Sequence, residues 1–230
     1  MSNIGFRIFT RIHRAPKALV EQFRGLPVAN IADEMNRMFC LDARIRPMNS
    51  SPLLGVAFTV RARPGDNLML HRAIDMAEPG DVIVVDAGGD LTNALIGELM
   101  VAYAKKKGVA GFVLNGAIRD YYSISQDDFP IFAAGVTHRG PYKDGPGEVN
   151  VPIAMGSLVI EPGDLILGDE DGVVGVPIDA VDVVYQAAHA KHLAEAAQLE
   201  AISAGKNDRR WVDETLAKLG CTGLSEVSGQ

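Results

Sequence analysis

The sequence holds little of the chemistry that marks disulfide-rich, thiolate-metal or membrane proteins. Only two of its 230 residues are cysteines, Cys40 and Cys221, and they lie far apart with no Cys-x-x-Cys spacing. A disulfide framework and a thiolate zinc site are therefore not expected, and both thiols should be reduced and structural. No apolar run approaches the ~20 residues that a membrane-spanning helix requires, so no membrane association is expected.

Basic residues are also scarce relative to acidic ones. Lysines and arginines number 22 against 29 aspartates and glutamates, which gives a formal net charge of −7. This balance repels polyanions, and no basic stripe with interleaved aromatic residues is present, so nucleic acid is not an expected partner. The N-terminal segment MSNIGFRIFTRIHRAPK is basic but lacks an apolar core followed by a small-residue cleavage site. We therefore expect a cytoplasmic protein.

What the sequence does have is a long alternation of helix-like and strand-like segments. Two amphipathic segments, APKALVEQFRG and VANIADEMNRMF, predict helices near the N-terminus. From Leu54 onward, strand patterns alternate with helical spacing, as in LGVAFTVRA, NLMLHRAIDMA and DVIVVDAGG. The pattern continues with the helical GELMVAYAKKK, closed by Gly108, and with the strands AGFVLNG and PIFAAG. Such an alternation predicts βαβ units with parallel strands.

Beyond Gly135 the pattern changes to short strands separated by glycine and proline turns, which predicts a mainly antiparallel half. Two stretches in the chain, EPGDVIVVDAGG and EPGDLILGDEDG, share a Pro-Gly turn that feeds a buried strand. We interpret this similarity as the same type of turn used twice rather than as an internal duplication of the sequence. The run from Ile178 to about Ala204 predicts a long helix, and DRRWVDETLAKLG predicts another.

Together these segments predict a single α/β domain over residues 1–230. It would comprise a helical N-terminal segment at 1–40, a core at 54–177 and C-terminal helices at 178–230. The core would combine parallel βαβ units with an antiparallel half. A long, exposed terminal helix of this kind often packs on a neighbouring subunit.

Arg119 and Asp120 stand at the carboxyl end of the predicted strand in GVAGFVLNGAIRD, which is where ligands gather in open α/β sheets. A guanidinium suits a carboxylate or an enolate oxygen, and a carboxylate is a hard ligand for Mg²⁺ or Mn²⁺. The alternative is that Asp120 caps a helix at YYSIS while Arg119 is solvated, because aspartate is among the best capping residues. The residues alone leave both interpretations open.

A second candidate is the segment Gly97-Glu98-Leu99-Met100, where a helix is expected to start. Backbone N–H groups in the first turn of a helix have no intrahelical partner and can bind an anion, and a glycine allows a ligand to approach closely. If the sheet places this turn beside Arg119, amides, a guanidinium and two acids would converge on one site. Glu98 has a simpler alternative role as a favourable negative charge in the first turn of a helix.

The segments GDNLMLHRAIDMAEPGDVIVVDAGG, GELM, GVAGFVLNGAIRD and DEDGVVGVP closely resemble the 4-hydroxy-4-methyl-2-oxoglutarate / 4-carboxy-4-hydroxy-2-oxoadipate aldolases. That family shares its fold with the protein regulators of ribonuclease E activity. The resemblance spans roughly Val28 to Pro177. It implies a metal-dependent class II pyruvate aldolase with a swivelling-domain-like β/β/α fold. It also implies a homotrimer or a dimer of trimers with active sites at subunit boundaries.

Carried over residue by residue, the resemblance implies that Arg119 binds pyruvate and stabilises its enolate, and that Asp120 is the direct ligand of Mg²⁺ or Mn²⁺. The segment Gly97 to Met100 would supply backbone contacts to the substrate carboxylate. The implied reaction cleaves a 4-hydroxy-2-oxo di- or tricarboxylate to pyruvate and a 2-oxo acid. Oxaloacetate decarboxylation is implied as a side activity, because it passes through the same enolate.

The resemblance also implies roles for three further residues. Glu98 would hold a metal-bound water, Asn67 would line the pocket, and Glu195 would complete the site from the neighbouring subunit's C-terminal helix. The alternative function is a non-catalytic regulator that binds a ribonuclease or helicase through its trimer surface. That branch generally lacks the acid after the arginine, so the presence of Asp120 favours the enzyme.

Two more residues near these motifs have open roles. His71 lies in a predicted amphipathic helix, where packing beside the pocket is a simpler expectation than catalysis. Lys143, in the loop segment PYKDGPGE, can reach either an anionic substrate or a neighbouring subunit. The sequence does not choose between these two roles for the lysine.

Overall fold

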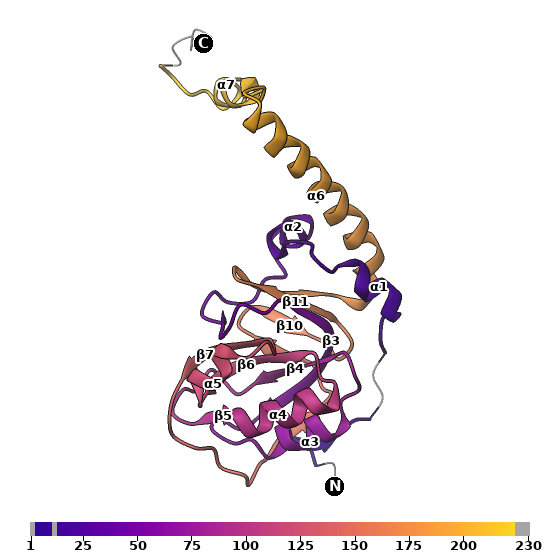
Figure 1. Cartoon of the computed structure of the whole chain (residues 1–230), viewed down its shortest axis with the longest axis vertical. Helices are drawn as coiled ribbons and strands as arrows, with labels where there is room; N and C mark the ends of the chain where they lie inside the picture. The colour runs from indigo at the N-terminus through magenta and orange to yellow at the C-terminus, as the bar shows by residue number, and fades with distance from the viewer. Residues whose placement is uncertain (1–2, 11–12, 224–230) are drawn as a thin grey trace. The chain divides into compact units, whose positions relative to one another are not determined.

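A computed structural model describes residues 3–10 and 13–223 of the chain (Figure 1). The chain divides into two compact units, Met1–His189 and Ala190–Gln230. The first unit holds a mixed ten-stranded sheet and the helices that cover it, and the second holds the C-terminal part of α6 (Val181–Ser203) and all of α7 (Arg210–Lys218). None of the described helices is both long enough and apolar enough to cross a membrane.

Four neighbouring strands form the parallel centre of the sheet. They are β3 (Leu53–Ala62), β4 (Asp81–Asp86), β6 (Gly111–Ile118) and β7 (Ile131–Val136), in that spatial order. Every residue of β6 is buried, as expected for a central strand of a sheet that is covered on both faces. Helix α3 (Leu68–Met76) connects β3 to β4, and helix α4 (Glu98–Lys107) precedes β6. The predicted parallel βαβ units are therefore confirmed.

The other strands are short. Six of them extend this centre, mainly through antiparallel pairs, and the remaining two pair with each other in a separate two-stranded sheet. The short strands are β1 (Phe6–Ile8), β2 (Arg46–Pro47), β5 (Ala94–Ile96), β8 (Gly147–Val149), β9 (Ile153–Met155), β10 (Leu158–Ile160), β11 (Leu165–Asp169) and β12 (Gly172–Val176). Strands β8 and β11 run antiparallel to β3, and β9 pairs with β10 in the same sense. Strands β11 and β12 form a hairpin whose turn is acidic. The expected antiparallel half is confirmed.

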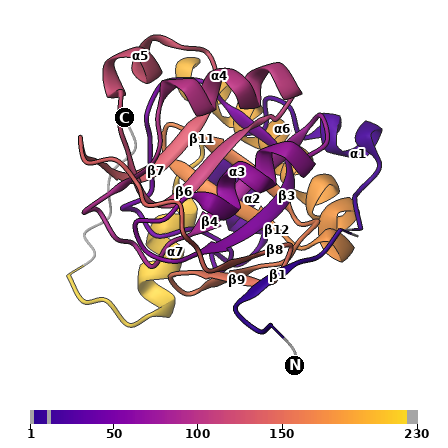
Figure 2. The ribbon, with the colours of Figure 1, turned by 90° about the horizontal axis from the view of Figure 1, so that it is seen from below.

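Helices cover the sheet in two groups. Helices α3 and α4 lie side by side (Figures 1 and 2), and α3 buries Met69, Leu70, Ala73 and Ile74 as it packs on β3. Helix α2 (Val28–Glu34) contacts β11 and β12, and α1 (Lys17–Gln22) shares a hydrophobic cluster with it. The short 3-10 helix η1 (Ile178–Ala180) follows β12 and precedes α6. The mixed α/β class inferred from the sequence is confirmed.

The N-terminal segment contains a strand that the sequence analysis did not predict. Residues 1–40 include the expected helices α1 and α2, but β1 comes before them and pairs in parallel with β8, with Phe6 opposite Gly147. A strand of three residues is too short to show a clear alternation of apolar and polar side chains. It forms because an edge of the sheet, 141 residues away in sequence, offers it hydrogen-bond partners.

The repeated Pro-Gly turn has the same structure at both of its occurrences. Oδ2 of Asp81 accepts the N–H of Glu78 at 2.9 Å, and Oδ2 of Asp164 accepts the N–H of Glu161 at 2.8 Å. The glycine inside each turn has a positive φ, 96° in the first and 104° in the second, which favours glycine. The two turns start β4 and β11, the strands that flank β3 on either side. The same turn chemistry is therefore used at both places.

Gly111 provides a test of close packing at the start of β6. A β-carbon at this position would overlap Cδ1 of Leu53 and lie 2.6 Å from the carbonyl oxygen of Pro130. We expect Gly111→Ala to lower the free energy of unfolding by about 1–3 kcal/mol, because the neighbours must shift to admit the methyl group. Urea unfolding followed by circular dichroism measures this change.

Gly175→Ala is the matched control, because this strand glycine has room for a methyl group. Its nearest neighbour, Cδ2 of Leu158, would lie 3.5 Å from the added carbon, which is ordinary van der Waals contact. We expect the control to unfold close to the wild-type midpoint. Equal midpoints for the two variants would contradict the packing argument.

Candidate active site

Two turns meet at one edge of the sheet, where β5 and β6 end. The strands pair in parallel, with Ile96 opposite Ile118, so their carboxyl ends lie together. The N–H of Arg119 donates to the carbonyl oxygen of Ile96 at 3.0 Å. Because Gly97 follows one strand and Asp120 follows soon after the other, the two segments singled out in the sequence are neighbours in space.

Asp120 joins these two turns. Its backbone is left-handed, with φ 57° and ψ 36°, and it occupies the N-cap position of α5 (Tyr121–Gln126). Its side chain makes no capping hydrogen bond to α5, but its Oδ2 accepts the N–H of Glu98 at 3.0 Å. Glu98 is the first residue of α4, and the positive end of a helix stabilises a carboxylate. The capping alternative therefore describes the position of Asp120 but not the contact of its carboxylate.

Gly97 is required by the close approach of side chains rather than by its backbone conformation. Its φ of −148° is extended and open to any residue. A β-carbon there would overlap Oδ2 of Asp120 and lie 3.0 Å from both Cγ and Nε of Arg119. The absent side chain at this position therefore lets the Arg-Asp pair lie against the first turn of α4.

The first turn of α4 keeps one amide available for a ligand. The N–H of Glu98 donates to Asp120, and the N–H of Met100 donates to the carbonyl oxygen of Gly97 at 3.0 Å. The N–H of Leu99 has no acceptor among the residues that the structure describes. Of the segment Gly97 to Met100, the amides of Gly97 and Leu99 are therefore the ones with no acceptor in the described ranges.

The guanidinium of Arg119 is partly exposed and loosely paired. Its Nε lies 3.7 Å from Oδ2 of Asp120, and the two side chains are 43% and 42% exposed. Within the described parts of the chain, the guanidinium makes no hydrogen bond. Its N–H donors are therefore available to a carboxylate or an enolate oxygen, which a planar fork of donors binds well.

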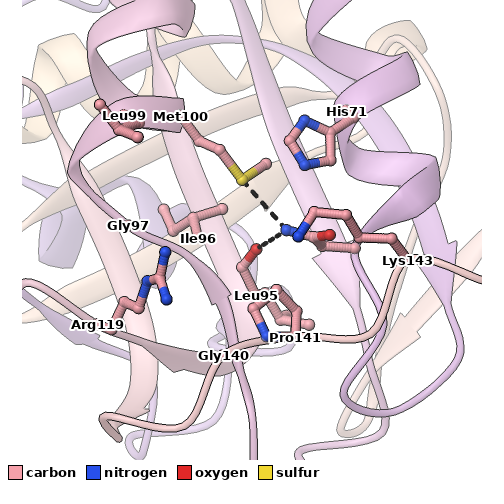
Figure 3. A pocket seen from close by; sticks show the side chains of 11 residues that line it. His71, Leu95, Ile96, Gly97, Leu99, Met100, Arg119, Gly140, Pro141 and Lys143 are labelled. Atoms are coloured by element: carbon pink, nitrogen blue, oxygen red, sulfur yellow. Dashed lines mark hydrogen bonds between the residues drawn. The ribbon is translucent and has the colours of Figure 1, made fainter.

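A pocket of about 250 Å³ opens beside these turns (Figure 3). Its walls come from α3 and its N-cap, from β5 and the start of α4, from the end of β6, and from a loop after β7. The lining residues are Asn67, His71, Leu95, Ile96, Gly97, Leu99, Met100, Arg119, Gly140, Pro141 and Lys143. The pocket thus includes most of the residues that the sequence analysis proposed for substrate binding.

Three of the proposed site residues, Asp120, Glu98 and Glu195, do not line this pocket. Asp120 stands next to it, against Gly97, while Glu98 lines a separate hollow of about 100 Å³ beside α5. Glu195 lies on α6, in the second unit, with Oε1 3.8 Å from Nζ of Lys191. Its place in a neighbouring subunit's site remains a prediction.

Asn67 and His71 bring unsatisfied polar atoms to the pocket. Asn67 is 2% exposed, and its Nδ2 donates to the carbonyl oxygen of Leu95 at 2.9 Å and to Sδ of Met100 at 3.3 Å (Figure 3, dashed lines). Oδ1 of Asn67 and Nε2 of His71 are buried with no hydrogen-bond partner in the described ranges. Burial lowers the pKa of His71 and the charge of Lys143 lowers it further, which favours the neutral ring.

Asp66 fixes the loop that carries Lys143. Asp66 is 1% exposed, and its Oδ2 accepts the N–H groups of Asp144 at 2.7 Å and Gly145 at 2.8 Å. Its Oδ1 accepts the N–H of Leu68, at the start of α3, at 2.9 Å. Asp66 was not predicted from the sequence, because its loop partners lie 78 and 79 residues away and no local motif marks the contact.

A divalent cation would find one carboxylate ligand at this site. No cluster of three His, Cys, Asp or Glu side chains able to hold a metal ion occurs among residues 3–10 and 13–223. Oδ1 of Asp120 has no hydrogen bond within those ranges, so one oxygen is available. Mg²⁺ commonly keeps several waters and binds through only one or two carboxylates, so the donor set fits that ion better than a softer metal.

A family model described as "RraA-like: Aldolase/RraA" matches residues 28–175. The chain belongs to the RraA-like family. A relative from Halalkalibacterium halodurans, named "Putative 4-hydroxy-4-methyl-2-oxoglutarate aldolase", is 43% identical over 185 residues, which cover 80% of this chain and 88% of the relative. The resemblance inferred from the motifs is therefore confirmed.

Solved structures of other proteins share the fold. An uncharacterized protein from Pseudomonas syringae pv. tomato is 26% identical with a TM-score of 0.76, over 84% of this chain and 96% of its own. A Streptomyces coelicolor protein, described as an unusual member of the RNase ES inhibitor RraA protein family, is 26% identical with a TM-score of 0.74. The match covers 81% of this chain and 98% of the Streptomyces chain. Names in this group thus point to both an aldolase and an inhibitor.

The Asp66 contacts provide a test of how the RraA-like pocket wall is held. Asp66→Ala removes the acceptor of three backbone N–H groups, so we expect the free energy of unfolding to fall by about 2–4 kcal/mol. Asp144→Ala is the control, because it keeps the backbone amide and removes only an exposed side chain. Its expected effect is within about 0.5 kcal/mol. Urea unfolding compares the two, and similar losses would contradict the assigned role of Asp66.

Proposed function

We propose that this chain is a divalent-metal-dependent aldolase. It cleaves a 4-hydroxy-2-oxo di- or tricarboxylate, such as 4-hydroxy-4-methyl-2-oxoglutarate or 4-carboxy-4-hydroxy-2-oxoadipate, to pyruvate and a 2-oxo acid. The observation that carries the proposal is one small pocket lined by Arg119 and by Leu99, whose amide is open, with Asp120 fixed beside it by the amide of Glu98. The name of the Halalkalibacterium relative supports the same activity.

Residues of the two turns that follow β5 and β6 act on the pyruvate half of the substrate. The amide of Leu99 binds the carboxylate next to the 2-oxo group, and Arg119 donates to the 2-oxo oxygen. Negative charge moves onto this oxygen as the carbon–carbon bond breaks, so Arg119 stabilises the enolate more than the ketone. Mg²⁺ or Mn²⁺ held by Asp120 would supply Lewis-acid stabilisation of the same charge. Oxaloacetate decarboxylation gives the same enolate and is an expected side activity.

The substrate's 4-hydroxyl needs a hydrogen-bond acceptor and then a base. Oδ1 of Asn67 is buried, unsatisfied and fixed in orientation, because Nδ2 of the same amide donates to Leu95. It therefore offers the hydroxyl an acceptor. We assign the deprotonation to a water ordered by Glu98, or by Glu195 from a neighbouring subunit of the proposed trimer.

Pyruvate release tests this function directly. The purified chain is incubated with 4-hydroxy-4-methyl-2-oxoglutarate, 4-carboxy-4-hydroxy-2-oxoadipate or oxaloacetate, each with Mg²⁺ and with excess EDTA. We expect cleavage of at least one aldol, loss of that cleavage in EDTA, and recovery when Mg²⁺ is restored. Asp120→Asn should lower kcat on the order of a hundredfold or more, because an amide is a weaker metal ligand than a carboxylate.

Asp128→Asn is the matched control, since Asp128 is an 84% exposed carboxylate that pairs with Lys105 away from the pocket. It should leave kcat unchanged. Failure of the folded wild-type protein to release pyruvate from any of the three substrates would refute the aldolase. Full activity in the Asp120→Asn protein would remove that residue from the mechanism.

Gly97→Ala tests the geometry of the site without changing a charged group. The added methyl group must displace the side chains of Asp120 and Arg119, and a shift of about 1 Å can cost on the order of a hundredfold in rate. We expect kcat to fall by that order while the far-ultraviolet circular dichroism spectrum is kept. Gly175→Ala, with room for its methyl group, serves again as the control and should keep full activity. A fully active Gly97→Ala enzyme would show that the close contact is not needed.

The second candidate function is a non-catalytic regulator of a ribonuclease or helicase. The description of the Streptomyces neighbour as a member of an RNase inhibitor family favours it. Such a protein would act through its surface and would not need the carboxylate of Asp120. Absence of turnover, together with ribonuclease inhibition that survives Asp120→Asn, would support this function instead.

A further inference from the structure

The pocket has a polar side that the chemistry at the pyruvate end does not use. His71, on α3, and Lys143, in the loop after β7, line the same cavity as Arg119. Figure 3 shows His71 and Lys143 on the side of the pocket away from Arg119. Neither residue contacts the 2-oxo group or the adjacent carboxylate in the arrangement described above.

Lys143 places an unpaired positive charge at the wall of the pocket, as judged from the described residues. Its side chain makes no hydrogen bond and no ion pair with any residue in the described ranges, although acidic residues are abundant in the chain. It lies near enough to His71 for its charge to lower the pKa of the imidazole. The loop itself is not loose, because Asp66 holds the two amides that follow Lys143.

His71 adds a directed donor to this charge. Its Nε2 is buried and has no partner within the described chain. A neutral imidazole carries its proton on one nitrogen, and in the Nε2–H form it donates from this position. A cation and a neutral donor that line one wall form a suitable binding site for a carboxylate.

We propose that Lys143 and His71 bind the second carboxylate of the substrate, the one carried by the half that leaves as the 2-oxo acid. This inference rests on the proposed aldolase function and names the residues that recognise the leaving half of the substrate. Arg119 and the amide of Leu99 then bind one end of the molecule, and Lys143 and His71 bind the other. The pair selects substrates whose leaving half is anionic over those in which it is neutral.

Binding of two stable 2-oxo acids tests the subsite without turnover. 2-Oxoglutarate and 2-oxopentanoate have the same chain length and differ only in a terminal carboxylate or methyl group. Isothermal titration calorimetry with Mg²⁺ at a fixed concentration should show 2-oxoglutarate binding about tenfold or more tightly to the wild-type protein. Lys143→Met should reduce this ratio to about one by weakening 2-oxoglutarate alone.

The controls separate a specific contact from a general change of charge. Lys106→Met removes an exposed lysine of α4 that does not line the pocket, and it should keep the wild-type ratio. His71→Asn should lower the ratio by several-fold with little change in the affinity for 2-oxopentanoate. Thermal melting of each variant confirms that it is folded before titration.

The possible results distinguish this inference from the function on which it rests. Equal wild-type affinities for the two acids, or equal weakening of both by Lys143→Met, would overturn the subsite. A wild-type ratio that Lys143→Met abolishes would support it. If that ratio is found while pyruvate release is absent, the dicarboxylate subsite stands and the aldolase function fails.

Discussion

The hydrogen bond from the amide of Glu98 to the carboxylate of Asp120 is the contact on which the site depends. It requires three conditions at once: no side chain at Gly97, a left-handed backbone at Asp120, and the parallel pairing of β5 with β6. The three are a residue type, a dihedral angle and a sheet register. The same contact joins the two turns that carry Arg119 and Leu99, and both of these residues line the pocket.

The sequence predicts the elements whose patterns are long or clearly bounded. The buried run of β4 and the helix from Glu98 to Lys107, closed by the left-handed Gly108, follow from periodicity and capping. The three-residue strands β1, β5 and β8 do not, because they have no measurable period and form only where a neighbouring strand offers hydrogen bonds. Their pairing is a property of the assembled sheet, and β5 happens to be the strand that positions the site.

Within the site, single residues could be predicted but their connections could not. Arg119 stands out because it follows a predicted strand, where ligands bind in α/β sheets, and Gly97 stands out because a helix is expected to start there. The contact of Asp66 with a distant loop carries no local signal, and neither do the unsatisfied atoms of Asn67 and His71. Burial and hydrogen-bond satisfaction depend on what the rest of the chain places around an atom, so only the folded structure shows them.

The charge of the whole chain and the charge of the pocket have opposite signs. The chain carries a formal −7, yet the two charged side chains that line the pocket are Arg119 and Lys143. Charges farther away than about 8 Å are largely screened at physiological ionic strength, so a small anion inside the pocket responds mainly to these two cations. A long polyanion meets the acidic surface instead. Ligand size therefore decides whether an anion interacts with the cations of the pocket or with the net negative charge of the chain. A small dicarboxylate is compatible with an acidic protein.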